Sequence, residues 1–212
     1  MELNARSQKV EAEDNCTVEI EKQATGMTFN LLSGALPLPT KPDLRKKTDL
    51  IPFQQELNQE QLTIKKLAKG SYKLFIDDRE VGSFTHRALK AGINLSAYST
   101  TPQYQQAEHI SELCFEYKKV QNEIRTIYFI EYRMLQNYDG PNTIAGKRAY
   151  LDWQLEKQKG KSYYNWNVKN CNRYFEVLPN EQKLWKELEV IREKIYTSNT
   201  PQWHTFKLKK IS

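Results

Sequence analysis

A long run of regularly spaced apolar residues after Thr100 constrains the fold of this chain more than any other feature. Thr100-Thr101-Pro102 is a typical helix start, with a threonine as N-cap and a proline in the first helical position. Asp139-Gly140-Pro141 is a typical stop. Between them, apolar residues recur every three or four positions: Ala107, Ile110, Leu113, Tyr117, Val120, Ile124, Ile127 and Leu135. This spacing predicts a helix of about 35 residues, which would rise roughly 50 Å and exceed the core of one small domain. Part of its apolar stripe therefore needs a partner.

The first third of the chain has the pattern of β-strands. Residues 15–33 alternate with a period of two on both sides of a turn near Gly26, which predicts a hairpin with one apolar face. Prolines between residues 35 and 55 predict an extended connector, because proline removes a backbone donor and disfavours helix before it. Residues 62–64 resemble a further strand, and residues 72–84 predict a tight hairpin that turns at Asp77-Asp78.

The last third is expected to be mainly helical. Residues 144–159 and 180–196 have helical periodicity, and an alternating pattern at residues 203–211 is a candidate closing strand. The sequence therefore predicts an α+β fold. Residues 1–100 would form a β-hairpin-rich region with a Pro-rich connector at 35–55, and residues 101–212 a mainly helical region that ends in the candidate strand.

Residues 67–107 carry a family resemblance. They contain LAKGSYKLFIDDREVGSF at 67–84, AGINLS at 91–96 and TPQYQQA at 101–107. An ALPLP stretch at 35–39 and a PF pair followed by LNQEQLTIK at 57–65 precede them. With these motifs, roughly residues 15–135 resemble the C-terminal accessory region of bacterial multi-domain SGNH (GDSL-type) hydrolases, a family of lipases, acylhydrolases and esterases. The resemblance implies a region that packs beside a catalytic domain and walls one side of its ester-binding cleft.

The catalytic motifs of that family are absent from the sequence. A serine hydrolase needs a nucleophile, an imidazole base, an orienting carboxylate and N–H donors for the oxyanion. There is no Gly-Asp-Ser, no Gly-x-Asn-Asp and no Asp-x-x-His pair at His86, His109 or His204. The resemblance thus implies a chain that is catalytically silent alone. Its catalytic domain would be lost by truncation, left out of the expressed piece, or supplied as a separate subunit.

Composition limits the partners and cofactors. Hydrophobic residues make up 39% of the 212 residues, enough to bury a core. A mean hydropathy of -0.77, with no apolar run of about 18 residues, argues against a membrane partner. The net charge of +6 is spread over intermixed charges, which argues against nucleic acid. Cys16, Cys114 and Cys171 lie too far apart for a metal-ligand pair, so neither metal nor cofactor is expected. Residues 1–15 lack the apolar core of a signal peptide, yet enzymes of this family are often exported, so the compartment stays open.

Five residues are candidates for ligand binding. Asn94, Gln103 and Tyr104 lie where AGINL leads into TPQY, and side chains near a helix start can meet a ligand. Tyr164 and Trp166 belong to the densest aromatic-polar cluster, residues 163–167, where rings could stack on sugars and amides could bond hydroxyls. For each of the five the alternative is packing, with Asn94 bonding the backbone of its own loop.

Two functions follow from these patterns. The first is the accessory part of an SGNH/GDSL-type hydrolase of acyl or carbohydrate esters. Its partner would be the SGNH catalytic domain, or a second copy of the chain that covers the apolar surface left bare. The alternative is a stand-alone module that binds carbohydrate or protein.

Overall fold

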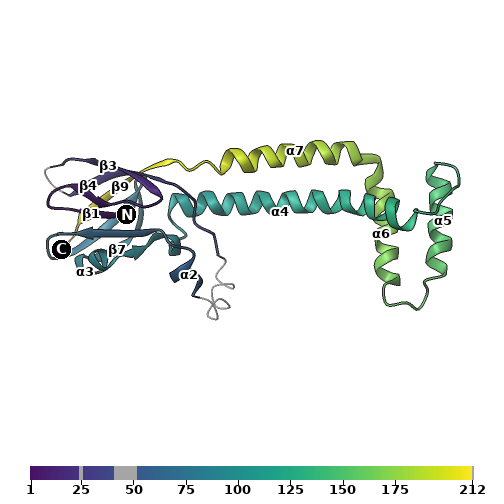
Figure 1. Ribbon diagram of the computed structural model, residues 1–212, viewed down its shortest axis with the longest axis horizontal. Coiled ribbons are helices and arrows are strands. Elements are labelled where there is room, and N and C mark those ends of the chain that lie inside the picture. Colours follow the sequence, from purple (N-terminus) through teal and green to yellow (C-terminus); the bar gives the residue numbers. More distant parts are fainter. Residues whose placement is uncertain (24–25, 41–51, 212) are drawn as a thin grey trace. The chain divides into compact units, whose positions relative to one another are not determined.

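The computed structural model describes residues 1–23, 26–40 and 52–211 and confirms the α+β class. The chain forms two compact units (Figure 1). The β unit comprises Met1–Glu112 together with Tyr196–Ser212, and the helical unit comprises Leu113–Ile195. The helical unit is thus inserted in the sequence of the β unit.

The β unit is built on two sheets. The four-stranded sheet has the order β2-β1-β5-β8, with β1 at Glu2–Asn4, β2 at Lys9–Ala12, β5 at Gln61–Lys65 and β8 at Ile93–Asn94. The five-stranded sheet has the order β3-β4-β9-β6-β7, with β3 at Cys16–Glu21, β4 at Met27–Ser33, β6 at Ser71–Ile76, β7 at Arg79–Thr85 and β9 at Trp203–Lys210. Short helices accompany them: α2 at Phe53–Glu56, α3 at His86–Ala91 and the 3₁₀ turn η2 at Leu95–Ala97.

Both predicted hairpins are present. Strands β3 and β4 pair antiparallel, and so do β6 and β7. The second hairpin turns at Asp77 and Asp78, whose φ angles of 47° and 63° lie in the left-handed region that aspartate tolerates better than most residues. Within the predicted connector, residues 53–56 form the short helix α2, and residues 41–51 lie outside the described part of the chain.

The candidate C-terminal strand forms, and it occupies the middle of the five-stranded sheet. Strand β9 pairs antiparallel with β4 on one side and with β6 on the other. Phe206 lies between Phe29 and Ile76 in these ladders, and its ring stacks on Phe29 with centroids 4.9 Å apart. Apolar side chains from both sheets fill one core: Leu3, Leu62 and Ile64 from one, and Phe29, Leu31, Leu74, Ile76, Phe206 and Leu208 from the other.

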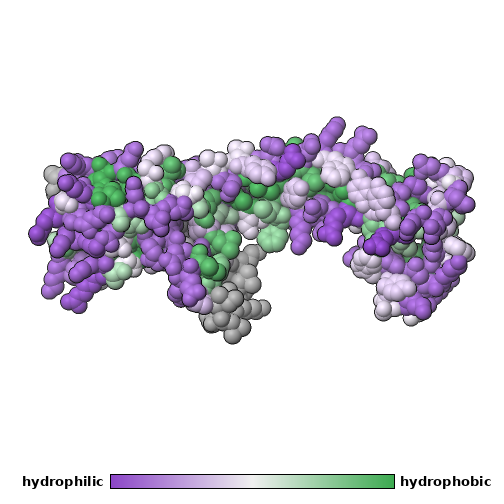
Figure 2. Space-filling view, viewed as in Figure 1, coloured by the Kyte–Doolittle hydropathy of each residue, from purple (hydrophilic) through white to green (hydrophobic). Residues whose placement is uncertain are grey.

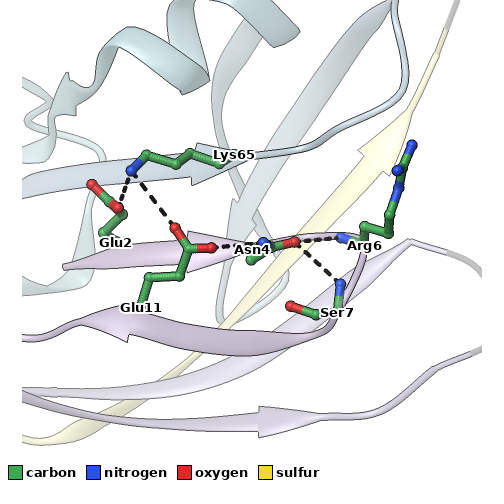
Figure 3. Close-up of polar contacts among 6 residues, drawn as sticks. All are labelled: Glu2, Asn4, Arg6, Ser7, Glu11 and Lys65. Carbon is green, nitrogen blue, oxygen red and sulfur yellow. Dashed lines mark hydrogen bonds and ion pairs between the residues drawn. The ribbon is translucent and has the colours of Figure 1, made fainter.

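A polar network ties the edge of the four-stranded sheet together (Figure 3). Lys65 on β5 pairs with Glu2 on β1 and lies 3.6 Å from Glu11 on β2. The Asn4 side chain donates to Glu11 over 2.6 Å and accepts from two backbone N–H groups of the β1–β2 turn. Because these side chains are partly exposed, the ion pairs contribute little stability. The backbone of the β1–β2 turn is held by the hydrogen bonds to Asn4.

The predicted long helix begins at Pro102 as expected, and its α-helical part ends at Phe129. Helix α4 spans Pro102–Phe129, and a π-helical turn, η3, follows at Ile130–Met134. The rest of the helical unit is α5 at Ile144–Glu156, α6 at Tyr164–Val177, the 3₁₀ turn η4 at Leu178–Asn180, and α7, which runs from Glu181 to Ser198.

The apolar stripe of α4 finds its partners within the chain. Leu113, Val120 and Ile124 pack against Leu188 and Ile191 of α7. Figure 2 shows hydrophobic residues gathered where these two helices run together. A second cluster continues the stripe and includes Ile127, Ile130, Met134, Leu151, Leu155, Cys171, Tyr174 and Val177. No helix in the described ranges is long and apolar enough to cross a membrane.

The units divide at other points than residue 100, where the sequence suggested a boundary. The first turns of α4 belong to the β unit, because Tyr104 is buried there and Gln106 donates to the carbonyls of Ser198 and Thr200. Residues after Ile195 also belong to it, because β9 is part of its sheet. Helical periodicity alone cannot show that β9, at the C-terminal end of the described chain, pairs with strands from the first half of the sequence.

Removing the Phe206 ring should destabilise the β unit strongly. We expect Phe206→Ala to lower its free energy of unfolding by about 3–5 kcal/mol, because it leaves a cavity beside Phe29. Hydrogen exchange of β4 and β6 during a urea titration measures the loss. Trp203→Ala on the same strand is the matched control, since that side chain is 47% exposed and should change stability by less than about 1 kcal/mol. Equal effects of the two changes would contradict this account of the core.

Candidate functional site

The best candidate for a functional site in the β unit is a small cavity around Glu60. It has a volume of about 220 Å³ and lies where the end of β4, the residues that follow it and the start of β5 meet. Its lining includes Cys16, Ser33, Pro37, Asn58 and Glu60. We call it the Glu60 cavity.

Glu60 has one engaged and one unengaged carboxylate oxygen. The Ser33 hydroxyl donates to Oε1 over 3.1 Å, while Oε2 is buried without a hydrogen-bond partner among the described residues. Burial raises the pKa of Glu60 from its usual value of 4.5 to about 7, and the hydrogen bond from Ser33 offsets only part of that rise. The carboxyl can therefore gain or lose a proton near neutrality, as general acids and bases do. No histidine lines the cavity.

Asn94 hydrogen-bonds the backbone that forms one wall of the Glu60 cavity. Its side-chain oxygen accepts from the backbone N–H of Glu60 over 2.9 Å, and its amide nitrogen donates to the carbonyls of Gln54 and Asn58, each over 2.9 Å. Ser96 adds a hydrogen bond to the Asn58 carbonyl over 2.5 Å. These bonds hold residues 54–60 in place. The structure thus places Asn94 beside the cavity, with its amide engaged by the protein.

Gln103 and Tyr104 lie at the start of α4 and line neither the Glu60 cavity nor its mouth. Tyr104 is 3% exposed, and its hydroxyl donates to the Thr40 carbonyl over 3.0 Å. Gln103 is 1% exposed, and neither amide atom has a hydrogen-bond partner in the described part of the chain. Thr101 accepts from the backbone N–H of Tyr104, the capping bond that the sequence predicted at this helix start.

Tyr164 and Trp166 lie on α6 in the helical unit, whereas Asn94, Gln103 and Tyr104 belong to the β unit. Tyr164 is partly buried and packs on the cluster around Tyr174. Trp166 is 55% exposed, and its ring meets the Phe129 ring edge-on with centroids 4.9 Å apart.

The structure also pairs two residues that the sequence could not connect, His204 and Asp77. The distance from His204 Nδ1 to an Asp77 carboxylate oxygen is 2.6 Å, and the other carboxylate oxygen accepts from the backbone N–H of Thr205 over 2.9 Å. A carboxylate that orients an imidazole is two-thirds of a catalytic triad. The remaining nitrogen, His204 Nε2, is buried and has no hydrogen-bond partner among the described residues, so no nucleophile is engaged there.

No cluster of three His, Cys, Asp or Glu side chains in the described ranges is placed to hold a metal ion.

We expect Glu60→Gln to remove a distinctive pH dependence of stability. Between about pH 4.5 and 7 the folded chain keeps a proton that the unfolded chain releases, so wild-type stability should fall as pH rises through this window. The fall should amount to roughly 3 kcal/mol or less. Urea denaturation from pH 4 to pH 8 measures it. Glu56→Gln is the control, because Glu56 is exposed and its variant should follow the wild-type profile. Parallel profiles for wild type and Glu60→Gln would contradict the assignment.

Asn94→Ala should lower the free energy of unfolding by about 2–4 kcal/mol, because it leaves buried backbone groups of residues 54–60 without partners. Thermal denaturation measures the loss. An unchanged midpoint would mean that Asn94 does not hold the wall of the cavity.

No protein-family model matches the chain, and no curated protein matches it either. Among solved structures the chain is similar to one described as a gut microbial diltiazem-metabolizing enzyme, with a TM-score of 0.82 and 29% sequence identity. The similarity covers 100% of this chain and 49% of that one, so the chain spans about half the length of that enzyme.

Proposed function

We propose that this chain is the accessory part of an SGNH/GDSL-type ester hydrolase and that a catalytic domain outside residues 1–212 carries out the chemistry. The observation that supports this most is the match of the whole chain, at a TM-score of 0.82, to about half of a metabolizing enzyme. A region with this fold therefore occurs within a larger enzyme. The motifs in residues 67–107 are what suggest the SGNH type.

The site geometry supports an accessory role. The Glu60 cavity joins a carboxyl to the Ser33 hydroxyl, and no imidazole lines it. His204 and Asp77 have the arrangement of a base and its orienting group, and the imidazole has no nucleophile among the described residues. Among the residues that the structure describes, neither place combines the nucleophile, base and orienting carboxylate that acyl transfer by a serine hydrolase uses.

The substrate would be an acyl or carbohydrate ester. Because the similar solved structure is described as a diltiazem-metabolizing enzyme, diltiazem is a second test substrate beside a simple acetyl ester. The contribution of the β unit would be to stabilise the catalytic domain and to wall one side of its cleft.

The first test looks for the catalytic domain. Sequencing the DNA on both sides of the coding region should find a segment with Gly-Asp-Ser early and Asp-x-x-His late. Mixed with that segment, this chain should raise hydrolysis of p-nitrophenyl acetate and diltiazem at least tenfold over either polypeptide alone. A Ser→Ala change in Gly-Asp-Ser should abolish the gain. If no such segment exists, or if this chain alone hydrolyses either ester at a rate that Ser33→Ala abolishes, the proposal is wrong.

A further inference from the structure

A polar groove crosses the helical unit between α4 and α6. It has a volume of about 620 Å³, within the range of small-molecule and sugar sites. All its lining residues except Val168 are polar or charged, and four of them are asparagines: Asn122, Asn165, Asn170 and Asn172. Asn122, Asn165 and Asn172 are exposed, and no described hydrogen bond engages their side-chain amides, which leaves those amides available to a ligand.

Two aromatic rings in contact, Trp166 and Phe129, lie on the same two helices as the groove and are not themselves among its lining residues. Trp166 is one turn before Asn170 on α6, and its carbonyl accepts from the Asn170 side chain over 2.7 Å. Phe129 is one turn after Thr126, a lining residue on α4. The Phe129 ring packs edge-on against the Trp166 indole and restricts its orientation. The Trp166 side chain nevertheless remains 55% exposed. A supported, exposed indole can stack on the apolar face of a pyranose ring without first being ordered.

Ion pairs connect the two helices at the groove. Arg173 on α6 donates twice to the Glu123 carboxylate on α4, over 2.7 and 2.8 Å, and once to Glu176 over 2.7 Å. These carboxylates keep lone pairs that can accept hydroxyl protons. Lys169 is the remaining charged lining residue. The two positive charges, on Lys169 and Arg173, therefore balance the two negative charges on the glutamates, and the net formal charge of the lining is zero. A surface that is neutral overall and rich in amides suits a neutral polyhydroxyl ligand better than a phosphate or a nucleic acid.

We propose that this groove binds a neutral oligosaccharide, with one pyranose ring stacked on Trp166 and its hydroxyls bonded by the asparagines and by Glu123. The inference goes beyond the accessory role and does not depend on it. If both hold, the helical unit would attach the hydrolase to the glycan that carries its ester substrate.

Titration calorimetry of the full chain tests the site, with cellohexaose, xylohexaose and mannohexaose as separate ligands. At least one should bind with a dissociation constant below 1 mM, roughly the weak end of specific recognition. Trp166→Ala should weaken that binding at least tenfold. Trp153→Ala is the matched control, because Trp153 is a half-exposed tryptophan of the same unit on α5, whereas the groove lies between α4 and α6, and the change should leave the affinity unchanged.

A second variant separates loss of the site from loss of the fold. Asn172→Ala changes an exposed residue of the groove and should weaken binding several-fold while the circular dichroism spectrum stays that of wild type. The proposal fails if no neutral hexasaccharide produces heat, or if Trp153→Ala weakens binding as much as Trp166→Ala. Because the assay contains no catalytic domain, none of these outcomes bears on ester hydrolysis.

Discussion

The β unit depends on the insertion of β9 between β4 and β6. Without β9, the pairs β3-β4 and β6-β7 would be two separate hairpins, and the stacked rings of Phe29 and Phe206 would not meet. Isolated hairpins are only marginally stable in water, so the five-stranded sheet requires the end of the chain. Since residues 113–195 lie between the two parts of this unit in sequence, the sheet closes only after the helical unit has been synthesised.

The Glu60 cavity and the α4–α6 groove differ in how they are built. In the first, the Asn94 side-chain amide hydrogen-bonds the backbone, and a carboxylate oxygen of Glu60 has no hydrogen-bond partner among the described residues. Burial raises the pKa of that carboxyl. In the second, exposed amides and an exposed indole lie on helices that are connected by hydrogen bonds from Arg173 to Glu123. A buried titratable group suits contact with a catalytic domain or a small ligand, while an exposed polar surface suits a long, hydrated one.

Several features could be predicted from local sequence alone. The helix start at Pro102, the turn at Asp77-Asp78 and the strands around residues 16–33 follow from capping, turn chemistry and period-two alternation, which act over a few residues. The helix end was less predictable. The periodicity continues to Leu135, whereas the structure changes to a π-helical turn at Ile130, where the Leu135 N–H bonds the Ile130 carbonyl. Such a change responds to packing around Ile130 and Met134, which pattern alone does not contain.

The sequence by itself determined the class of the fold, the positions of most elements and the lack of a Gly-Asp-Ser and Asp-x-x-His pair. Tertiary structure decided which strand joins which sheet, that Asn94 meets Glu60, and that His204 meets Asp77 across a separation of 127 residues. It also separated Asn94 from Trp166 by placing them in different units. The physical reason is range: capping and periodicity are set by neighbours along the chain, whereas strand order, buried carboxylates and grooves depend on contacts between segments far apart in sequence.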